Sequence, residues 1–247
     1  VFFMIWRDIK VRYKQTLLGA SWAILQPLLT MVVFNFFFGT LAEVPSDGVP
    51  YPIFSFTALL PWQLFSKALQ DAARSLVSNR HMITKVYFPR LVLPLSSIVA
   101  GLVDFGIAFV VLLGMMIFYQ TPLRIEMLAL PLLLLLALIT ALGVGLWMSA
   151  LNVLYRDIAY VMPFLAQFWM YITPVVYPAS LVPEKWRFIY YLNPMTGVVE
   201  GFRWALLGTQ SALPPLMMVL SVVISSVFLI SGLFYFRRME RLFADMV

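Results

Sequence analysis

The sequence contains no cysteine and a single histidine, His81. The missing cysteines exclude disulfides, thiolate metal sites and cysteine nucleophiles, and one histidine cannot form a His-rich metal site. There is also no G-x-x-x-x-G-K-[ST] phosphate loop, because the nearest spacing, Gly101 to Gly106, lacks the lysine. We therefore expect no cofactor or metal on this chain, and any ATP that drives it must be bound by another chain.

Charged residues are also scarce, at 11% of the chain, against about 25% in soluble proteins. Hydrophobic residues make up 62% and occur in long blocks rather than at amphipathic spacing. Because a spanning helix needs about 20 largely apolar residues, the sequence predicts an all-α integral membrane protein with a single transmembrane domain over residues 1–247. The six predicted spans lie at about residues 20–41, 53–73, 91–119, 128–151, 158–177 and 214–236.

Positive charge is distributed unevenly between the two sides of these spans. Thirteen of the 17 Lys and Arg residues fall on the side that holds both termini, including the tail of residues 237–247. By the positive-inside rule this side is cytoplasmic, which agrees with an even number of spans. Membrane orientation accounts for the net charge of +6, so we expect no nucleic-acid partner.

Residues 1–19 have the pattern of an amphipathic helix that lies in the cytoplasmic membrane interface. Two roles are open for it: a lipid anchor with snorkelling cations, or an anchor that also braces a cytoplasmic partner. Apolar residues four apart form one face and basic residues another, namely Ile5, Ile9, Tyr13 and Leu17 against Arg7, Lys10 and Lys14.

A compact basic element, "RHMITKVYFPRLVLP", separates the second and third spans at residues 80–94. Pro89 is expected to end a short helix before the third span begins. Three interpretations compete: a lipid anchor, a substrate site, and a docking element for another protein. The connection between the fourth and fifth spans, marked by Asn152, Arg156 and Asp157, is either a plain turn or a small helix that contacts a partner.

Asp104 is the only acidic residue deep inside a predicted span. A carboxyl group in the middle of a membrane is costly, so it should face other helices, and it can be protonated. It is either a proton or substrate site, or it forms a hydrogen bond to a neighbouring helix. Because no cationic partner is expected inside the membrane, we favour the hydrogen bond.

The segment of residues 178–213 is punctuated by prolines and predicts two short helices, at about 183–192 and 195–208. Neither can span a bilayer, and half-helices at membrane depth must be surrounded by protein or line a water-filled cavity. One interpretation is a re-entrant pair that forms an outer gate, in which Gly197 and Gly201 permit close helix contact. The other is an ordinary loop lying on the membrane interface.

Aromatic residues make up 16% of the chain, and many lie near the outer ends of the predicted spans. An interfacial belt explains most of them, although aromatic faces also suit the C–H-rich sides of sugar rings. The residues concerned are Tyr51, Trp62, Tyr119, Trp169, Tyr171, Tyr177, Trp186, Tyr190, Tyr191 and Trp204.

Four motifs occur in a specific order along the chain. The motif "RDIKVRYKQTLLGASWAILQPL" opens it, "MITKVYFPRLVLP" follows the second span, "LNVLYRDIAYVMPFLAQFWMYITPVVY" crosses the fourth connection, and "YYLNPMTGVVEGFRWALLG" precedes the last span. Together they resemble the membrane subunits of polysaccharide-exporting ABC transporters, which move lipid-linked O antigen, teichoic acid or capsular polymer across the bacterial cytoplasmic membrane. The resemblance covers essentially the whole chain.

This resemblance implies a homodimer that works with two copies of a separate ATPase, which holds ATP and Mg. It places a channel along the first and fifth spans and the outer gate in residues 178–213. Coupling to the ATPase would involve Ile83, Thr84, Lys85, Val86, Tyr87, Phe88, Arg90, Tyr155, Arg156 and Asp157. Candidates for holding the carrier pyrophosphate are Arg7, Arg12 and Arg90. Candidates for the channel and gate are Tyr51, Trp62, Trp169, Tyr171, Tyr177, Tyr190, Tyr191, Asn193 and Trp204.

Two other functions stay open at this point. One is an ATP-independent secondary transporter or channel with Asp104 as its ion site, and the other is an ABC exporter of a different lipid or a drug. A membrane enzyme is disfavoured, because no catalytic carboxylate pair or metal site is evident. Asp157 stands beside Arg156, and Glu184 and Glu200 are expected to face outside.

Overall fold

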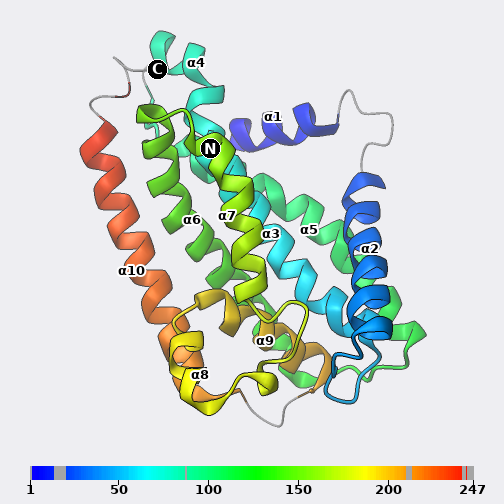
Figure 1. Ribbon diagram of the computed structural model, residues 1–247. Helices are drawn as coiled ribbons and strands as arrows, with labels where there is room; N and C mark the ends of the chain where they lie inside the picture. Colours follow the sequence, from blue (N-terminus) through cyan, green and yellow to red (C-terminus); the bar gives the residue numbers. More distant parts are fainter. Residues whose placement is uncertain (1, 14–20, 87, 210–212, 241–242, 244–247) are drawn as a thin grey trace.

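The computed structural model describes residues 2–13, 21–86, 88–209, 213–240 and 243. Every regular element within these ranges is a helix (Figure 1), which confirms the predicted all-α class. The α-helices are α1 (Phe2–Tyr13), α2 (Ser21–Phe34), α3 (Tyr51–Ser78), α4 (Arg80–Lys85), α5 (Val92–Phe118), α6 (Leu130–Leu154), α7 (Ile158–Ile172), α8 (Glu184–Tyr191), α9 (Pro194–Leu207) and α10 (Pro215–Met239). A π-helical stretch, Asn35–Leu41, extends α2, and short 3₁₀ turns lie at Ile125–Ala129 and Ala179–Leu181.

Four helical segments of the described chain are long and apolar enough to cross a membrane: Ser21–Leu41, Val92–Phe118, Ile125–Leu154 and Pro215–Met239. They match the first, third, fourth and sixth predicted spans. The second and fifth predicted spans correspond to α3, which has 28 residues but carries several polar side chains, and to α7, which is apolar but has only 15 residues. A multi-pass membrane protein is confirmed, and six spans stay a prediction.

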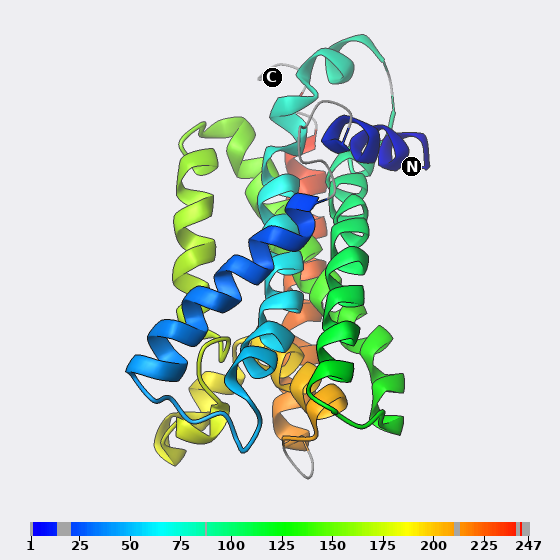
Figure 2. The ribbon, with the colours of Figure 1, turned by 90° about the vertical axis from the view of Figure 1, so that its right-hand side faces the viewer.

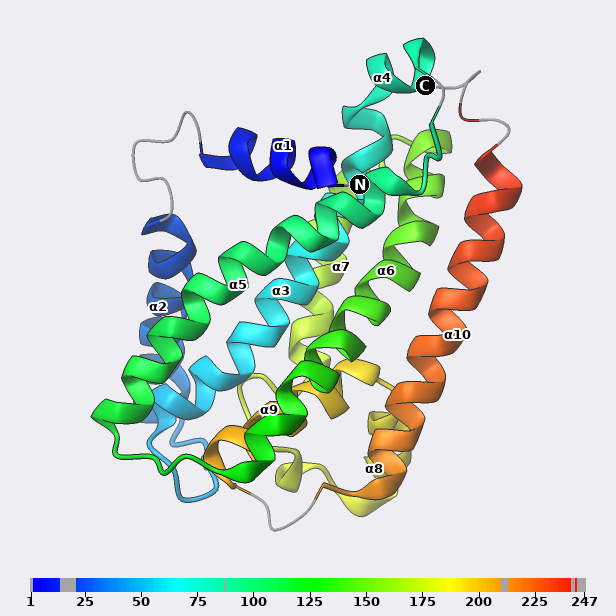
Figure 3. The same ribbon diagram turned by 180° about the vertical axis from the view of Figure 1, so that it is seen from behind.

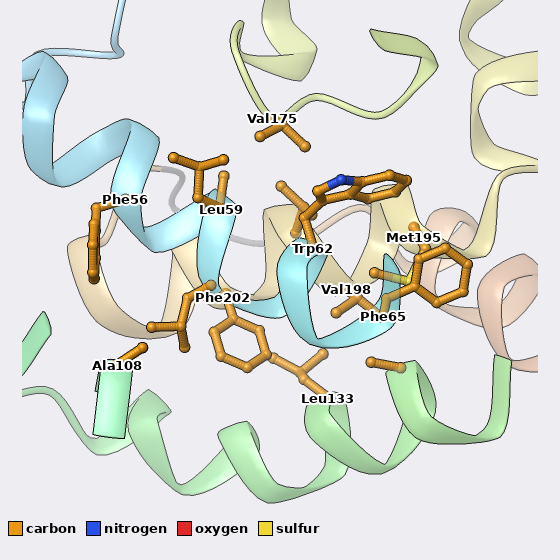
Figure 4. Close-up of a cluster of buried hydrophobic side chains, with 14 of the residues drawn as sticks. Phe56, Leu59, Trp62, Phe65, Ala108, Leu133, Val175, Met195, Val198 and Phe202 are labelled. Carbon is orange, nitrogen blue, oxygen red and sulfur yellow. The ribbon is translucent and has the colours of Figure 1, made fainter. Parts of the chain in front are cut away.

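The centre of the molecule is α3, which packs against α2, α5, α6, α7 and α9. Around the first half of α3 the core consists of large apolar side chains from several helices. Figure 4 shows Trp62 and Phe65 of α3 close to Val198 and Phe202 of α9, with Leu133 of α6 nearby. Burial of this apolar surface holds the short helix α9 against the long ones.

The molecule has two distinct ends, joined by the long helices. One end, here called the α4 end, carries α1, α4 and the turn of residues 155–157 between α6 and α7 (Figures 1 and 3). The last described residue, Phe243, belongs to this end as well, because it packs in a cluster with Ile83 of α4. The opposite end, the α9 end, carries α8 and α9. Helix α1 lies across the ends of the long helices rather than along them, as expected for an interfacial helix.

Candidate functional site

One face of α3 carries an unbroken row of polar side chains. They are spaced three and four residues apart, which places them on one side of a helix, and the opposite side holds residues that are fully or almost fully buried, such as Phe65, Leu69 and Leu76. The sequence analysis treated this segment as an ordinary span and missed the row, although its helical spacing is visible in the sequence. The polar residues are Gln63, Ser66, Lys67, Gln70, Asp71 and Arg74.

The polar row of α3 lines a cavity of about 590 Å³ between α2, α3, α5 and α7, which we call the central cleft. Figure 2 shows α2 passing in front of α3, with α5 on one side and α7 on the other. The other helices add Gln26 and Thr30 from α2, Asp104 from α5 and Gln167 from α7, while Trp62 and Phe105 provide aromatic surface. The cleft therefore combines amides, hydroxyls, charges and aromatic rings within the helical bundle.

Within the central cleft, Lys67 and Asp104 form an ion pair. The distance from Lys67 Nζ to Asp104 Oδ2 is 2.7 Å, and the two side chains are 47% and 14% exposed. The expectation that Asp104 lacks a cationic partner inside the membrane was wrong, because the packing of α3 against α5 brings Lys67, which lies within the second predicted span, to its carboxylate. The favoured interpretation, a hydrogen bond between Asp104 and a neighbouring helix, is confirmed, and its partner is a charged lysine.

A second cavity, of about 580 Å³, lies beneath α1 at the α4 end. It is lined by Arg7 and Asp8 of α1 and shares Asp71 and Arg74 of α3 with the central cleft. Arg7 donates to the carboxylate of Asp8 at 2.8 Å, and Arg74 donates to the carbonyl of Ala159 at 3.3 Å. The shared lining residues make the polar surface continuous from the α4 end into the middle of the bundle.

At the α9 end, the guanidinium of Arg203 is completely buried and stacks on Phe54, with its central carbon 3.6 Å from the ring centre. It donates to the carbonyls of Pro174, Val175 and Tyr177 at 2.6, 2.8 and 3.2 Å. A fourth bond joins it to the carboxylate of Glu200 at 2.9 Å. Glu200, which we expected on the outer side of the membrane, is buried at the α9 end, where one helical turn brings it against Arg203, which neutralises it.

This arrangement explains how an irregular backbone is accommodated between α7 and α8. The hydroxyl of Tyr51 donates to the carbonyl of Val176 at 2.7 Å. Together with the bonds from Arg203, four consecutive carbonyls, those of residues 174–177, accept side-chain hydrogen bonds. Non-helical backbone at membrane depth requires such partners.

Two further contacts fix α9 in place. Asn193 caps its first turn by accepting from the Met195 amide, and it also accepts from Trp169 Nε1 at 2.9 Å. A Cβ added to Gly201 would lie 2.6 Å from Leu133 of α6, and one added to Gly197 would collide with Ser221 of α10. The predicted close helix contact at these two glycines is confirmed, and so are the two short helices, α8 and α9.

Most of the predicted channel and gate residues are buried or half-buried in this chain. Tyr51 and Trp62 are 7% and 3% exposed, so they belong mainly to the core, although Trp62 also borders the central cleft. Tyr171, at 51%, is exposed. The remaining six are partly covered: Trp169, Tyr177, Tyr190, Tyr191, Asn193 and Trp204. Burial raises the pKa of the Tyr190 phenol above its ordinary value.

Tyr171 is the end of an exposed aromatic stripe along α7 that the sequence analysis did not identify. Its members follow one another at steps of four, four and three residues, which keeps them on one helix face. This spacing was readable in the sequence. The stripe consists of Tyr160, Phe164, Phe168 and Tyr171, which are 83%, 68%, 56% and 51% exposed.

The residues predicted to couple to an ATPase divide into exposed and inward-facing groups. Ile83 is 6% exposed and Phe88 is partly buried, and both pack in a cluster with Phe236 of α10. Arg90 donates to the carbonyl of Glu240 and lies 6.0 Å from the ring centre of Phe243. Ile83, Phe88 and Arg90 therefore serve internal packing, while Tyr87 lies outside the described residues. Exposed members are Thr84, Lys85, Val86, Tyr155, Arg156 and Asp157.

Of the three arginines proposed to hold a pyrophosphate, the two whose side chains the structure describes, Arg7 and Arg90, have different surroundings. Arg90 is engaged with the C-terminal segment, as described above, and Arg7 lines the cavity beneath α1. The side chain of Arg12 falls outside the described part of the chain. Of the two described side chains, that of Arg7 faces a polar cavity.

Comparisons with known proteins agree with the motifs found in the sequence. The family model described as "ABC-2 type transporter" matches residues 1–207. The O-antigen export system permease protein RfbA of Myxococcus xanthus is 30% identical over 243 residues, which cover 96% of this chain and 92% of that protein. RfbA of Klebsiella pneumoniae is 30% identical over 198 residues, covering 80% and 76%. The polysialic acid transport protein KpsM of Escherichia coli is 25% identical over 207 residues, covering 81% and 78%.

Proposed function

This chain belongs to the ABC-2 type transporter family, and we propose that it is the membrane subunit through which a lipid-linked polysaccharide leaves the bacterial cytoplasm. The observation that carries the proposal is the match to O-antigen export permeases over nearly the whole length of both chains. The central cleft supports it, because a cavity rich in amides and hydroxyls inside a membrane bundle suits a hydrated polymer rather than a lipid tail.

The energy for transport comes from a separate ATPase in this proposal, since the chain has no phosphate loop. Two copies of that ATPase dock on the α4 end of a permease homodimer. Contact is made by the exposed residues at the end of α4, Thr84, Lys85 and the following Val86, together with Tyr155 and Arg156 of the neighbouring turn. Both surfaces belong to the same end of the molecule (Figure 1), so one ATPase subunit can touch both.

The polymer passes between two protomers, along surfaces supplied by α2 and α7. The exposed stripe of α7, from Tyr160 to Tyr171, offers ring faces on which sugars slide without tight binding. The closed α9 end acts as the outer gate, and the carrier pyrophosphate enters near Arg7 at the α4 end. Both termini are then cytoplasmic, in agreement with the bias of basic residues.

The ion pair between Lys67 and Asp104 weighs against an ATP-independent transporter. A transported ion would have to compete with an ammonium group 2.7 Å from the carboxylate. A structural ion pair between two helices accounts for Asp104 without an ion pathway.

ATP-driven export from sealed vesicles tests the proposal. The permease and an ATPase from the same gene neighbourhood are reconstituted together with lipid-linked polysaccharide, and polymer that reaches the opposite leaflet is measured by lectin binding. We expect export that requires ATP and is lost when the ATPase is inactivated. Export without ATP, or export abolished by Asp104→Asn in vesicles that lack the ATPase, would contradict it.

A further inference from the structure

The central cleft carries equal numbers of positive and negative side chains. Among its lining residues, Lys67 and Arg74 are basic, and Asp71 and Asp104 are acidic. The charges of Lys67 and Asp104 meet directly, with 2.7 Å between Nζ and Oδ2. Arg74 follows Asp71 by three residues on the same face of α3 and donates to the carbonyl of Ala159. The described side chains that line the cleft therefore carry no surplus positive charge with which to attract an acidic ligand.

The remaining polar groups of the cleft are mainly amides. Gln26 of α2, Gln63 and Gln70 of α3, and Gln167 of α7 enter it from three directions. An amide side chain both donates and accepts hydrogen bonds, as a sugar hydroxyl does. Trp62 and Phe105 add aromatic surface, and a volume of about 590 Å³ lies within the range of about 300–1,000 Å³ that is typical of small-molecule sites.

A carboxylate-bearing sugar would be poorly accommodated in this cleft. It would lose part of its hydration and meet no surplus positive charge among the described lining residues, and removing a charge from water without such compensation is costly. A neutral sugar segment loses only hydroxyl–water hydrogen bonds, which the four amides replace. The distinction matters because the similar proteins include O-antigen permeases and also a protein named for polysialic acid, which carries a carboxylate on every sugar.

We propose that the central cleft is a binding site for an uncharged, hydroxyl-rich sugar segment, and that the Lys67–Asp104 pair makes this permease selective for neutral over acidic polymers. The inference rests on the proposed export function and adds the substrate class. It makes Asp104 a specificity-determining residue, because its carboxylate cancels the charge of Lys67.

Binding of two hexasaccharides tests the inference. The full-length permease in lipid nanodiscs is titrated with a mannose hexamer and with a sialic acid hexamer, and affinities are measured by saturation-transfer NMR. For the wild type we expect the neutral hexamer to bind at least about tenfold more tightly, the order of effect that one charge interaction produces at partly buried sites. Equal binding of the two hexamers, tighter binding of the acidic one, or no binding of either would overturn the inference.

Variants that change the charge of the Lys67–Asp104 pair provide a sharper test of the inference. Asp104→Asn leaves Lys67 uncompensated, so the acidic hexamer should bind about fivefold or more tightly than to the wild type, and salt should remove the gain. The double variant Lys67→Gln with Asp104→Asn should return to weak acidic binding. Glu126→Gln is the matched control, because Glu126 pairs with Arg124 at 3.0 Å outside the cleft. Unchanged selectivity in Asp104→Asn would overturn the inference.

These outcomes are separable from those of the vesicle experiment. ATP-driven export without discrimination between neutral and acidic sugars would refute selectivity and leave the export function standing. Absence of any polysaccharide export would refute the function itself. The thermal unfolding temperature of each variant is measured as well, and we expect the single and double variants to unfold at similar temperatures. A variant that unfolds much earlier identifies a loss of binding that comes from misfolding.

Discussion

At the scale of single residues, Arg203 is the side chain on which the α9 end depends most. Its guanidinium supplies donors to three carbonyls of a non-helical link and to Glu200, and it rests on the ring of Phe54. Arginine suits this role because its planar fork of donors stays charged and can stack on an aromatic face. A lysine ammonium has three donors, fewer than the four acceptors that Arg203 reaches.

We expect Arg203→Met to lower the free energy of unfolding by about 3–5 kcal/mol, because it leaves Glu200 buried without its cation and removes the donor from several buried carbonyls. Thermal unfolding of the purified protein measures the effect. Arg187→Met is the matched control, since Arg187 also pairs with a glutamate three residues earlier, Glu184, but in an exposed position. The control should unfold almost as the wild type does, and equal losses in the two variants would contradict the burial argument.

At the scale of elements, α4 is a short helix held firmly by its own chain. Ile83 and Phe88 pack in one cluster with Leu93 of α5 and Phe236 of α10, and Arg90 contacts the C-terminal segment at Glu240. These contacts tie α4 to the ends of two long helices. A push on α4 would therefore be transmitted to α5 and α10 instead of being lost in a loose loop.

Because Phe88 stabilises the permease itself, the exposed residues Val86 and Tyr155 are the better probes of ATPase docking. We expect Val86→Asp combined with Tyr155→Ala to reduce association with the ATPase at least tenfold, a loss of about 1.4 kcal/mol or more, as seen by co-purification and quantitative pull-down. The residues are 57% and 63% exposed, so the fold should be retained.

Leu181→Asp serves as the control for docking, because Leu181 is 52% exposed and lies at the α9 end, beside α8. It should leave ATPase association unchanged. Full association of the Val86 and Tyr155 double variant, or an equal loss in the control, would show that the ATPase docks elsewhere.

At the scale of the whole molecule, the two ends differ in construction. The α4 end combines exposed basic and polar side chains with a polar cavity, whereas the α9 end is closed by buried contacts around Arg203 and Asn193. The central cleft opens toward the α4 end through the shared residues Asp71 and Arg74. This asymmetry is consistent with a polymer that enters at one end and is retained by a gate at the other.

The natural absence of cysteine makes the orientation directly testable with single-cysteine variants. Ser180→Cys at the α9 end should react with a membrane-impermeant maleimide in intact cells. Thr84→Cys at the α4 end should react only after the membrane is inverted or permeabilised. Both positions are exposed. Labelling of Thr84→Cys from outside intact cells would reverse the proposed orientation.

The sequence by itself determined the class of the protein and most of its helices. Long apolar blocks require helices in a bilayer, because every backbone group must be satisfied within its own segment, and this constraint acts locally. The break around Pro178 and the short helices α8 and α9 were predictable for a local reason too, because prolines interrupt the segment and leave pieces too short to span a bilayer. The polar row of α3 and the exposed aromatic stripe of α7 could also be predicted from residue spacing alone.

Only the tertiary structure decided which side chains meet. Lys67 and Asp104 are 37 residues apart, Arg203 reaches carbonyls up to 29 residues away, and Arg90 meets Glu240 across 150 residues. No local pattern encodes these contacts, because they depend on how helices tilt and pack against one another. The buried apolar faces set that packing, and the packing in turn determined whether these charged side chains formed an ion pair, donated hydrogen bonds to the backbone or stayed exposed.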